Sequence, residues 1–124
     1  MVRYDQLTKD LGRVLPELRI PVETEKRSWK GETPGQHVVF GNVLSPFLVE
    51  ELDRGDRPDV LARAFAFLEG MARSPDLLVQ EVVQQSVLAD LCGTQPWSKR
   101  LGSVLGPESK RLMIEYCDAN HRPH

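Results

Sequence analysis

The fold of this chain is decided by residues 75–92, which read PDLLVQEVVQQSVLADLC. On a helix drawn through this stretch, apolar side chains occupy most of the circumference and polar ones form a narrow stripe. The valines would also suit a strand, but eighteen residues are too many for one strand. The pattern therefore predicts a central helix on which several other helices pack.

Prolines mark the expected starts of helices along the chain. Five of them each precede an apolar stretch: Pro46, Pro58, Pro75, Pro96 and Pro107. Proline suits the first position of a helix, where its missing N–H would have no partner within the helix. Apolar residues recur at steps of three and four in residues 58–72, as on one face of a helix. The sequence therefore predicts an all-α fold, a compact bundle of about six to seven short helices with proline-initiated starts.

Length and composition indicate one domain. The chain has 124 residues, of which 40% are hydrophobic and 27% charged, as in a globular domain with a single core. We expect a single all-α domain over 1–124. Residues 19–36 are polar and lack a helical period, so we expect a loop there. We also expect a frayed tail at 119–124.

Residues 37–44 are compatible with two structures. Val38, Val39 and Phe40 are typical of a strand, whereas Phe40, Val43 and Leu44 continue at helical spacing. We favour a helix that breaks at Pro46.

Charge is distributed unevenly along the chain. The net charge is −2 and the pI is about 5.9, which argues against a nucleic-acid partner. Residues 37–96 carry nine acidic and four basic side chains, whereas the segments on either side are slightly basic. Such an asymmetry influences the choice of partner and the rate of association.

The acidic residues of the middle segment form the one dense group of chemically interesting side chains. The predicted partner-binding residues are Glu50, Glu51, Asp53, Asp56, Asp90 and, in the polar segment, Trp29. Asp56 precedes the helix expected at Pro58, where negative charge is favourable. Glu50, Glu51 and Asp53 instead fall at the end of a helix, where the helix dipole disfavours acids. If the helices run up and down, Asp53 and Asp90 meet at one electronegative end of the bundle. The alternative is that these acids are simply solvated.

Trp29 is flanked by Arg27 and Lys30. A tryptophan in such a segment either covers the core or anchors an interface.

The remaining motifs do not predict a catalytic centre. Cys92 and Cys117 end apolar helix faces, where thiols usually act as small hydrophobic side chains, so we expect neither a disulfide framework nor a metal site. The glycine pairs of residues 31–35 and 102–106 lack the lysine of a phosphate-binding loop. We therefore expect no cofactor, no metal and no enzymatic activity. The longest apolar run spans only residues 64–68, and no signal peptide precedes it, so we expect a cytoplasmic protein without a membrane span.

Three stretches carry a resemblance to a known kind of protein: HVVFGNVLSPFL (37–48), FLEGMARSPD (67–76) with VQEVVQQSVL (79–88), and LGPESKRL (105–112). Together they resemble a bacterial family of small all-helical proteins of unknown function. Small acidic proteins of this kind look like immunity proteins of polymorphic or contact-dependent toxins. The resemblance covers about 37–116 and implies no catalytic residue.

These observations lead to one expected function and two alternatives. We expect a non-enzymatic immunity protein that neutralises a cognate bacterial toxin through its acidic patch, which would suit a basic toxin. The first alternative is a helical adaptor or regulatory subunit that binds a partner protein through an apolar groove on the 58–72 or 97–119 helix faces. The second is an enzyme with a carboxylate-centred or Cys–His site, in which His37 would supply the imidazole. The oligomeric state is left open.

Overall fold

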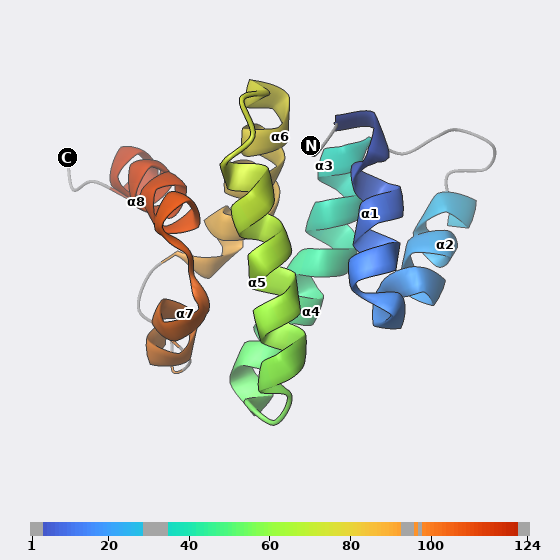
Figure 1. Cartoon of the computed structure of the whole chain (residues 1–124), viewed down its shortest axis with the longest axis horizontal. Helices are drawn as coiled ribbons and strands as arrows, with labels where there is room; N and C mark the ends of the chain where they lie inside the picture. The colour runs from blue at the N-terminus through green and yellow to red at the C-terminus, as the bar shows by residue number, and fades with distance from the viewer. Residues whose placement is uncertain (1–3, 29–34, 93–95, 97, 122–124) are drawn as a thin grey trace.

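The computed structural model describes residues 4–28, 35–92, 96 and 98–121. All regular structure in these residues is helical, which confirms the predicted all-α fold. The described chain contains seven uninterrupted helical segments, within the expected range. Figure 1 shows α5 and α6 in the middle of the molecule, with α1 and α2 at one end and α7 and α8 at the other.

The first three segments are η1 and α1 (Tyr4–Gln6 and Leu7–Val14), η2 and α2 (Pro16–Leu18 and Arg19–Ser28), and α3, η3 and α4 (Gln36–Val39, Phe40–Leu44 and Ser45–Arg54). Then come α5 (Pro58–Ala72) and α6, η4 and η5 (Leu77–Glu81, Val82–Val87 and Leu88–Leu91). The last two are α7 (Ser98–Val104) and α8 (Pro107–His121).

The helix built from α6, η4 and η5 lies in the core, as predicted. It contacts α3, η3, α5 and α8 along its length. Its buried apolar side chains are Val79, Val82, Val83, Val87, Leu88 and Leu91. Only the first turn departs from the expected burial, since Leu77 is 68% exposed.

Residues 36–54 form one continuous helix, so the expectation of a break at Pro46 is wrong. The part of this helix at Phe40–Leu44 is π-helical, and Ser45 and then Pro46 follow it directly. In a regular α-helix, the proline ring would clash with the carbonyl group one turn earlier. The wider π turn before Pro46 changes that spacing, which lets the helix continue through the proline.

The other predicted proline starts are partly confirmed. Pro58 and Pro107 are the first residues of α5 and α8. Pro75 and Pro96 instead precede the first residues of α6 and α7 by two positions.

The expected polar loop at 19–36 is wrong for residues 19–28, which form α2. This helix buries only Val22, so it has no apolar face for a periodicity argument to detect. Local contacts support it, including the hydrogen bond from Thr24 Oγ1 to the Ile20 carbonyl oxygen at 2.9 Å. Pro21 lies in the first turn of α2, where a missing N–H costs little. Residues 29–34 lie outside the described residues.

The expected frayed tail is also partly wrong, because α8 continues to His121. Residues 122–124 lie outside the described residues. Within the described residues, no helix is both long enough and apolar enough to cross a membrane.

Cys92 and Cys117 form a disulfide, which corrects the expectation that they act only as small apolar side chains. The bond joins the residue after η5 to α8, and the Cα atoms lie 5.9 Å apart. The sequence alone did not show that the two residues are close in space, because they are 25 positions apart and meet only when α8 packs beside η5.

We expect reduction of this disulfide to lower the free energy of unfolding by about 2–4 kcal/mol, because the bond restricts the unfolded chain. Urea unfolding with and without a phosphine reductant measures the difference. The Cys92→Ser/Cys117→Ser double variant serves as the control, because the reductant should leave its stability unchanged. Equal stability of the oxidised and reduced wild-type protein would contradict this expectation.

The start of α8 is held by a carboxylate from α5. Glu69 accepts hydrogen bonds from the backbone N–H groups of Glu108 at 3.0 Å and Ser109 at 2.9 Å. Gly106 makes room for this approach, since a Cβ atom there would collide with the Glu69 carboxylate. Burial opposes ionisation of Glu69, but the two N–H groups and the nearby Arg73 charge act against it, and the pKa of this carboxyl lies below its usual value.

We expect Glu69→Gln to lower the free energy of unfolding by about 1 kcal/mol at pH 7, because the ionised carboxylate interacts better with the start of the helix. The lowered pKa sets the sign of the pH dependence. The advantage of the wild type is complete above the ordinary carboxyl pKa and declines as the pH falls through the lowered folded-state pKa. Thermal unfolding of both proteins between pH 3 and pH 7 tests this, and a constant difference over that range would contradict it.

Candidate functional site

Three of the predicted acidic residues line one groove. Glu50 and Asp53 come from α4 and Asp90 from η5, and all three side chains are exposed. We call this space, of about 590 Å³, the acidic groove. Its other lining residues are Ser45, Pro46, Val49 and Pro96. The structure therefore places Asp53 and Asp90 on one groove. Asp90 bonds to Ser45 at the start of α4, whereas Asp53 lies eight positions further along, about 12 Å at the helical rise. The expected meeting of two helix ends at one end of the bundle stays a prediction.

The contacts of these acids leave most of their charge uncompensated. Asp53 forms no ion pair with any described residue, and Asp90 accepts a hydrogen bond from the neutral Ser45 hydroxyl at 2.5 Å. Glu50 pairs with Arg54 at 2.6 Å, but both side chains are exposed and solvent weakens the pair. Asp53 also lies in the last turn of α4, at the negative end of the helix dipole. The described lining of the groove therefore holds three carboxylates and no cationic side chain. Two cations lie at the C-terminal end of α4, where Arg54 pairs with Glu50 and Arg100 donates to the Leu52 carbonyl oxygen.

Glu51 does not belong to this surface, which corrects the sequence prediction. It is only 1% exposed, and its carboxylate accepts hydrogen bonds from Nε of Arg57 at 3.0 Å and from Nη2 of the same side chain. The Arg57 guanidinium also lies 5.9 Å from the centre of the Phe47 ring. The hydrogen bond to Glu51 raises the pKa of Arg57. Glu51 therefore holds the turn between α4 and α5 and is not available to a partner.

We expect Glu51→Lys to lower the free energy of unfolding by about 3 kcal/mol or more, because it buries a second cation beside Arg57. Glu50→Lys is the matched control one position earlier, and its exposed site predicts a loss of less than about 1 kcal/mol. Urea unfolding of both variants measures the contrast. Equal losses would show that Glu51 has no special structural role.

Of the two other predicted residues, the structure describes only Asp56. Asp56 is exposed in the turn between α4 and α5, and it does not line the groove. Trp29 lies outside the described residues, so its predicted role as an anchor stays a prediction.

A second groove adjoins the first. It lies between α2 and the α3–α4 helix, has a volume of about 450 Å³, and is called here the apolar groove. Its apolar lining residues are Leu18, Ile20, Pro21, Val43, Pro46 and Phe47. Pro46 and Glu50 line both grooves, so the two spaces share one wall on α4.

Sequence reasoning missed the apolar groove because half of it comes from α2, which was expected to be a loop. It also missed Ser45, whose side chain donates a hydrogen bond to Asp90. The sequence feature that could have indicated this groove is the apolar pair Ile20 and Pro21 within an otherwise polar segment. Both side chains are exposed, so they do not belong to the core.

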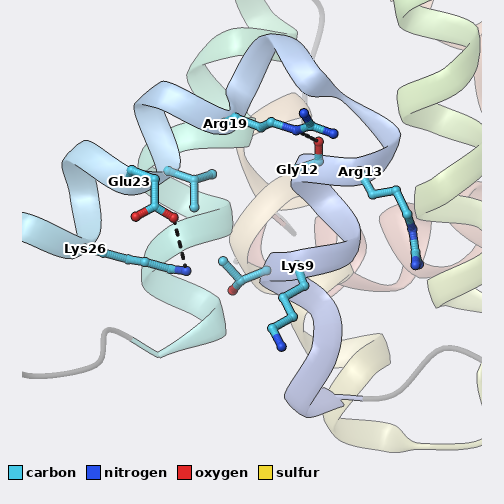
Figure 2. Close-up of a pocket in the computed structure, with 8 residues that line it drawn as sticks. Lys9, Gly12, Arg13, Arg19, Glu23 and Lys26 are labelled. Carbon is cyan, nitrogen blue, oxygen red and sulfur yellow. Dashed lines mark hydrogen bonds and ion pairs between the residues drawn. The ribbon is translucent and has the colours of Figure 1, made fainter.

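A third groove, of about 460 Å³, lies between α1 and α2 and carries the opposite charge (Figure 2). Its cationic lining residues are Lys9, Arg13, Arg19 and Lys26. Three of these already have partners within the chain: Arg13 pairs with Asp10, Nε of Arg19 donates to the Gly12 carbonyl oxygen at 3.0 Å, and Lys26 pairs with Glu23 at 3.5 Å. In Figure 2, Arg13 points away from Lys26 and Glu23. The ion pairs of Arg13 and Lys26 include exposed side chains, as does the pair between Glu50 and Arg54, so solvent weakens them in the same way.

The residues considered for catalysis do not form a catalytic arrangement. The disulfide leaves no thiol at Cys92 or Cys117 for a Cys–His pair. His37 Nδ1 lies 2.6 Å from the Ser86 hydroxyl, and no described carboxylate pairs with the ring to orient it. Within the described residues, no three His, Cys, Asp or Glu side chains are grouped so that they could hold a metal ion.

The chain belongs to the DUF7674 family, a domain of unknown function that matches residues 8–121. This match extends through almost the whole chain, including both helices that line the acidic groove. Comparison with curated proteins and with solved structures finds no match.

Proposed function

We propose that this chain is a non-enzymatic protein-binding domain that neutralises a basic protein by covering its functional surface with the acidic groove. The observation that carries the proposal is that Asp53 and Asp90, from two different helices, line one groove and form no ion pair with a described cation. A basic protein such as a nuclease would be steered electrostatically towards this groove and bound there.

An immunity protein against a bacterial toxin is the most concrete form of this function. A toxin that acts on nucleic acid needs a cationic surface to bind its substrate, and an acidic surface can occupy it in place of the phosphates. The helices that carry the groove are anchored in the core through the buried Leu48, Leu52, Leu88 and Leu91. A rigid acidic surface avoids the ordering cost that a flexible one pays on binding.

An adaptor could use a groove on the faces expected from the sequence. Most apolar side chains of α5 are buried within the chain, as are Leu101 and Leu112. Between α5 and the α7–α8 segment, however, lies a space of about 430 Å³ whose lining includes Phe65, Ala66, Val104 and Pro107. The apolar groove beside α2 is a second surface that suits an adaptor.

The cellular location belongs to the proposal as well. The cytoplasmic location expected from the sequence stays a prediction. The Cys92–Cys117 bond instead favours an oxidising compartment, where such bonds persist.

The test begins with capture of the partner by the tagged chain from its own cells and identification by mass spectrometry. Stopped-flow mixing then compares the association rate of the wild type with that of the Glu50→Gln/Asp53→Asn/Asp90→Asn variant. We expect the variant to associate at least about tenfold more slowly at low salt and to lose most of its salt dependence. These substitutions retain side-chain shape, and the amide oxygen introduced at position 90 would still accept the hydrogen bond from Ser45.

The matched control removes the same charge elsewhere, as Glu23→Gln/Glu81→Gln/Glu115→Gln. If both triple variants slow association equally, net charge alone is responsible. If neither does, the acidic groove is not the binding surface, and the proposal fails.

A further inference from the structure

The wall between the acidic and apolar grooves is a single row of side chains. Pro46 and Glu50 are four positions apart on α4 and so stand one above the other on the same face. A partner that crosses this wall therefore contacts both grooves.

The apolar groove is built to take an apolar side chain. Ile20 is 79% exposed at its edge, and Pro21 and Phe47 continue the apolar surface into the space. Polar groups at the rim are already engaged, since Nδ2 of Asn42 donates to Glu25 at 2.9 Å and Thr24 bonds to its own helix. An apolar occupant therefore removes exposed apolar surface from water without breaking these hydrogen bonds.

The charge next to the apolar groove identifies the occupant. Glu50 borders both spaces, and Asp53 and Asp90 lie beyond it on the acidic side. An acidic or neutral apolar segment would bring no compensating charge to these carboxylates. A segment with basic side chains close to its apolar one satisfies both grooves together.

We infer that both grooves receive one cationic helix, which places an apolar side chain beside Ile20 and basic side chains across the shared wall, beside Asp53 and Asp90. This inference rests on the proposed function and specifies the chemistry of its partner. The apolar contact supplies affinity that salt does not screen, and the ionic contacts supply orientation and a fast association.

The probe is a synthetic, end-capped, alanine-based helical peptide of about 18 residues, long enough to be partly helical alone. It carries one leucine with arginines three and four positions away. Titration into ¹⁵N-labelled protein, followed by NMR, gives both the dissociation constant and the residues contacted. We expect shifts in both grooves, and about tenfold weaker binding when the leucine is replaced by alanine.

Variants of the protein separate the two contacts. Ile20→Ser should weaken binding about fivefold, and the loss should persist in high salt, because the contact is apolar. Leu77→Ser is the matched control, since Leu77 is an equally prominent exposed side chain on α6, away from both grooves, and it should leave binding unchanged. Asp53→Asn should weaken binding at low salt only. Both Ile20 and Asp53 are exposed, so these substitutions should not disturb folding.

The outcomes distinguish this inference from the proposed function. Weaker binding by Asp53→Asn together with unchanged binding by Ile20→Ser would overturn the two-groove inference and leave the acidic groove in place. Weaker binding by Ile20→Ser with no effect of Asp53→Asn would overturn the cationic partner, and the proposed function with it. No binding of the leucine–arginine peptide up to about 1 mM, or shifts confined to other surfaces, would also overturn the inference.

Discussion

The burial of one valine-rich helix, Leu77–Leu91, is the constraint on which the rest of the structure depends. Its apolar side chains can leave water only if other helices cover most of its circumference, and α3, η3, α5 and α8 do so. This packing also fixes which helix lies beside the C-terminal end of the valine-rich helix. There η5 lies against α4, and the buried Ser45 bonds to Asp90 across the contact. The acidic groove is thus a consequence of how the core packs.

The parts of the fold that depend on apolar periodicity could be predicted from the sequence. The core helix and α5 both bury the side chains that recur at helical spacing. The elements that were missed lack this signal. Helix α2 buries only Val22, and the disulfide joins residues whose proximity depends on how α8 packs. The π turn before Pro46 lets the helix continue through the proline, whereas the presence of proline by itself predicts a break.

In the candidate site, too, some features could be predicted from the sequence and others could not. That Asp53 and Asp90 line one groove agrees with the predicted grouping of these acids, but Asp90 faces Ser45 at the start of α4, which the positions of both acids near the ends of helical patterns did not indicate. The contrast between Glu50 and Glu51 could not be predicted. Neighbouring residues on a helix point about 100° apart, so one carboxylate faces solvent while the next enters the protein and meets Arg57. A run of acids in a sequence therefore overstates the charge that a surface presents.

The most direct test of the acidic groove as a binding surface is a hydrogen-exchange footprint of the chain bound to its captured partner. The backbone amides of residues 45–53 and 88–91 would be compared in the free and bound protein, together with those of residues 18–24 beside the apolar groove. We expect slower exchange in all three segments on binding and little change in α8. Protection centred on α8, or on the groove between α1 and α2, with these segments unchanged, would contradict the proposed binding surface.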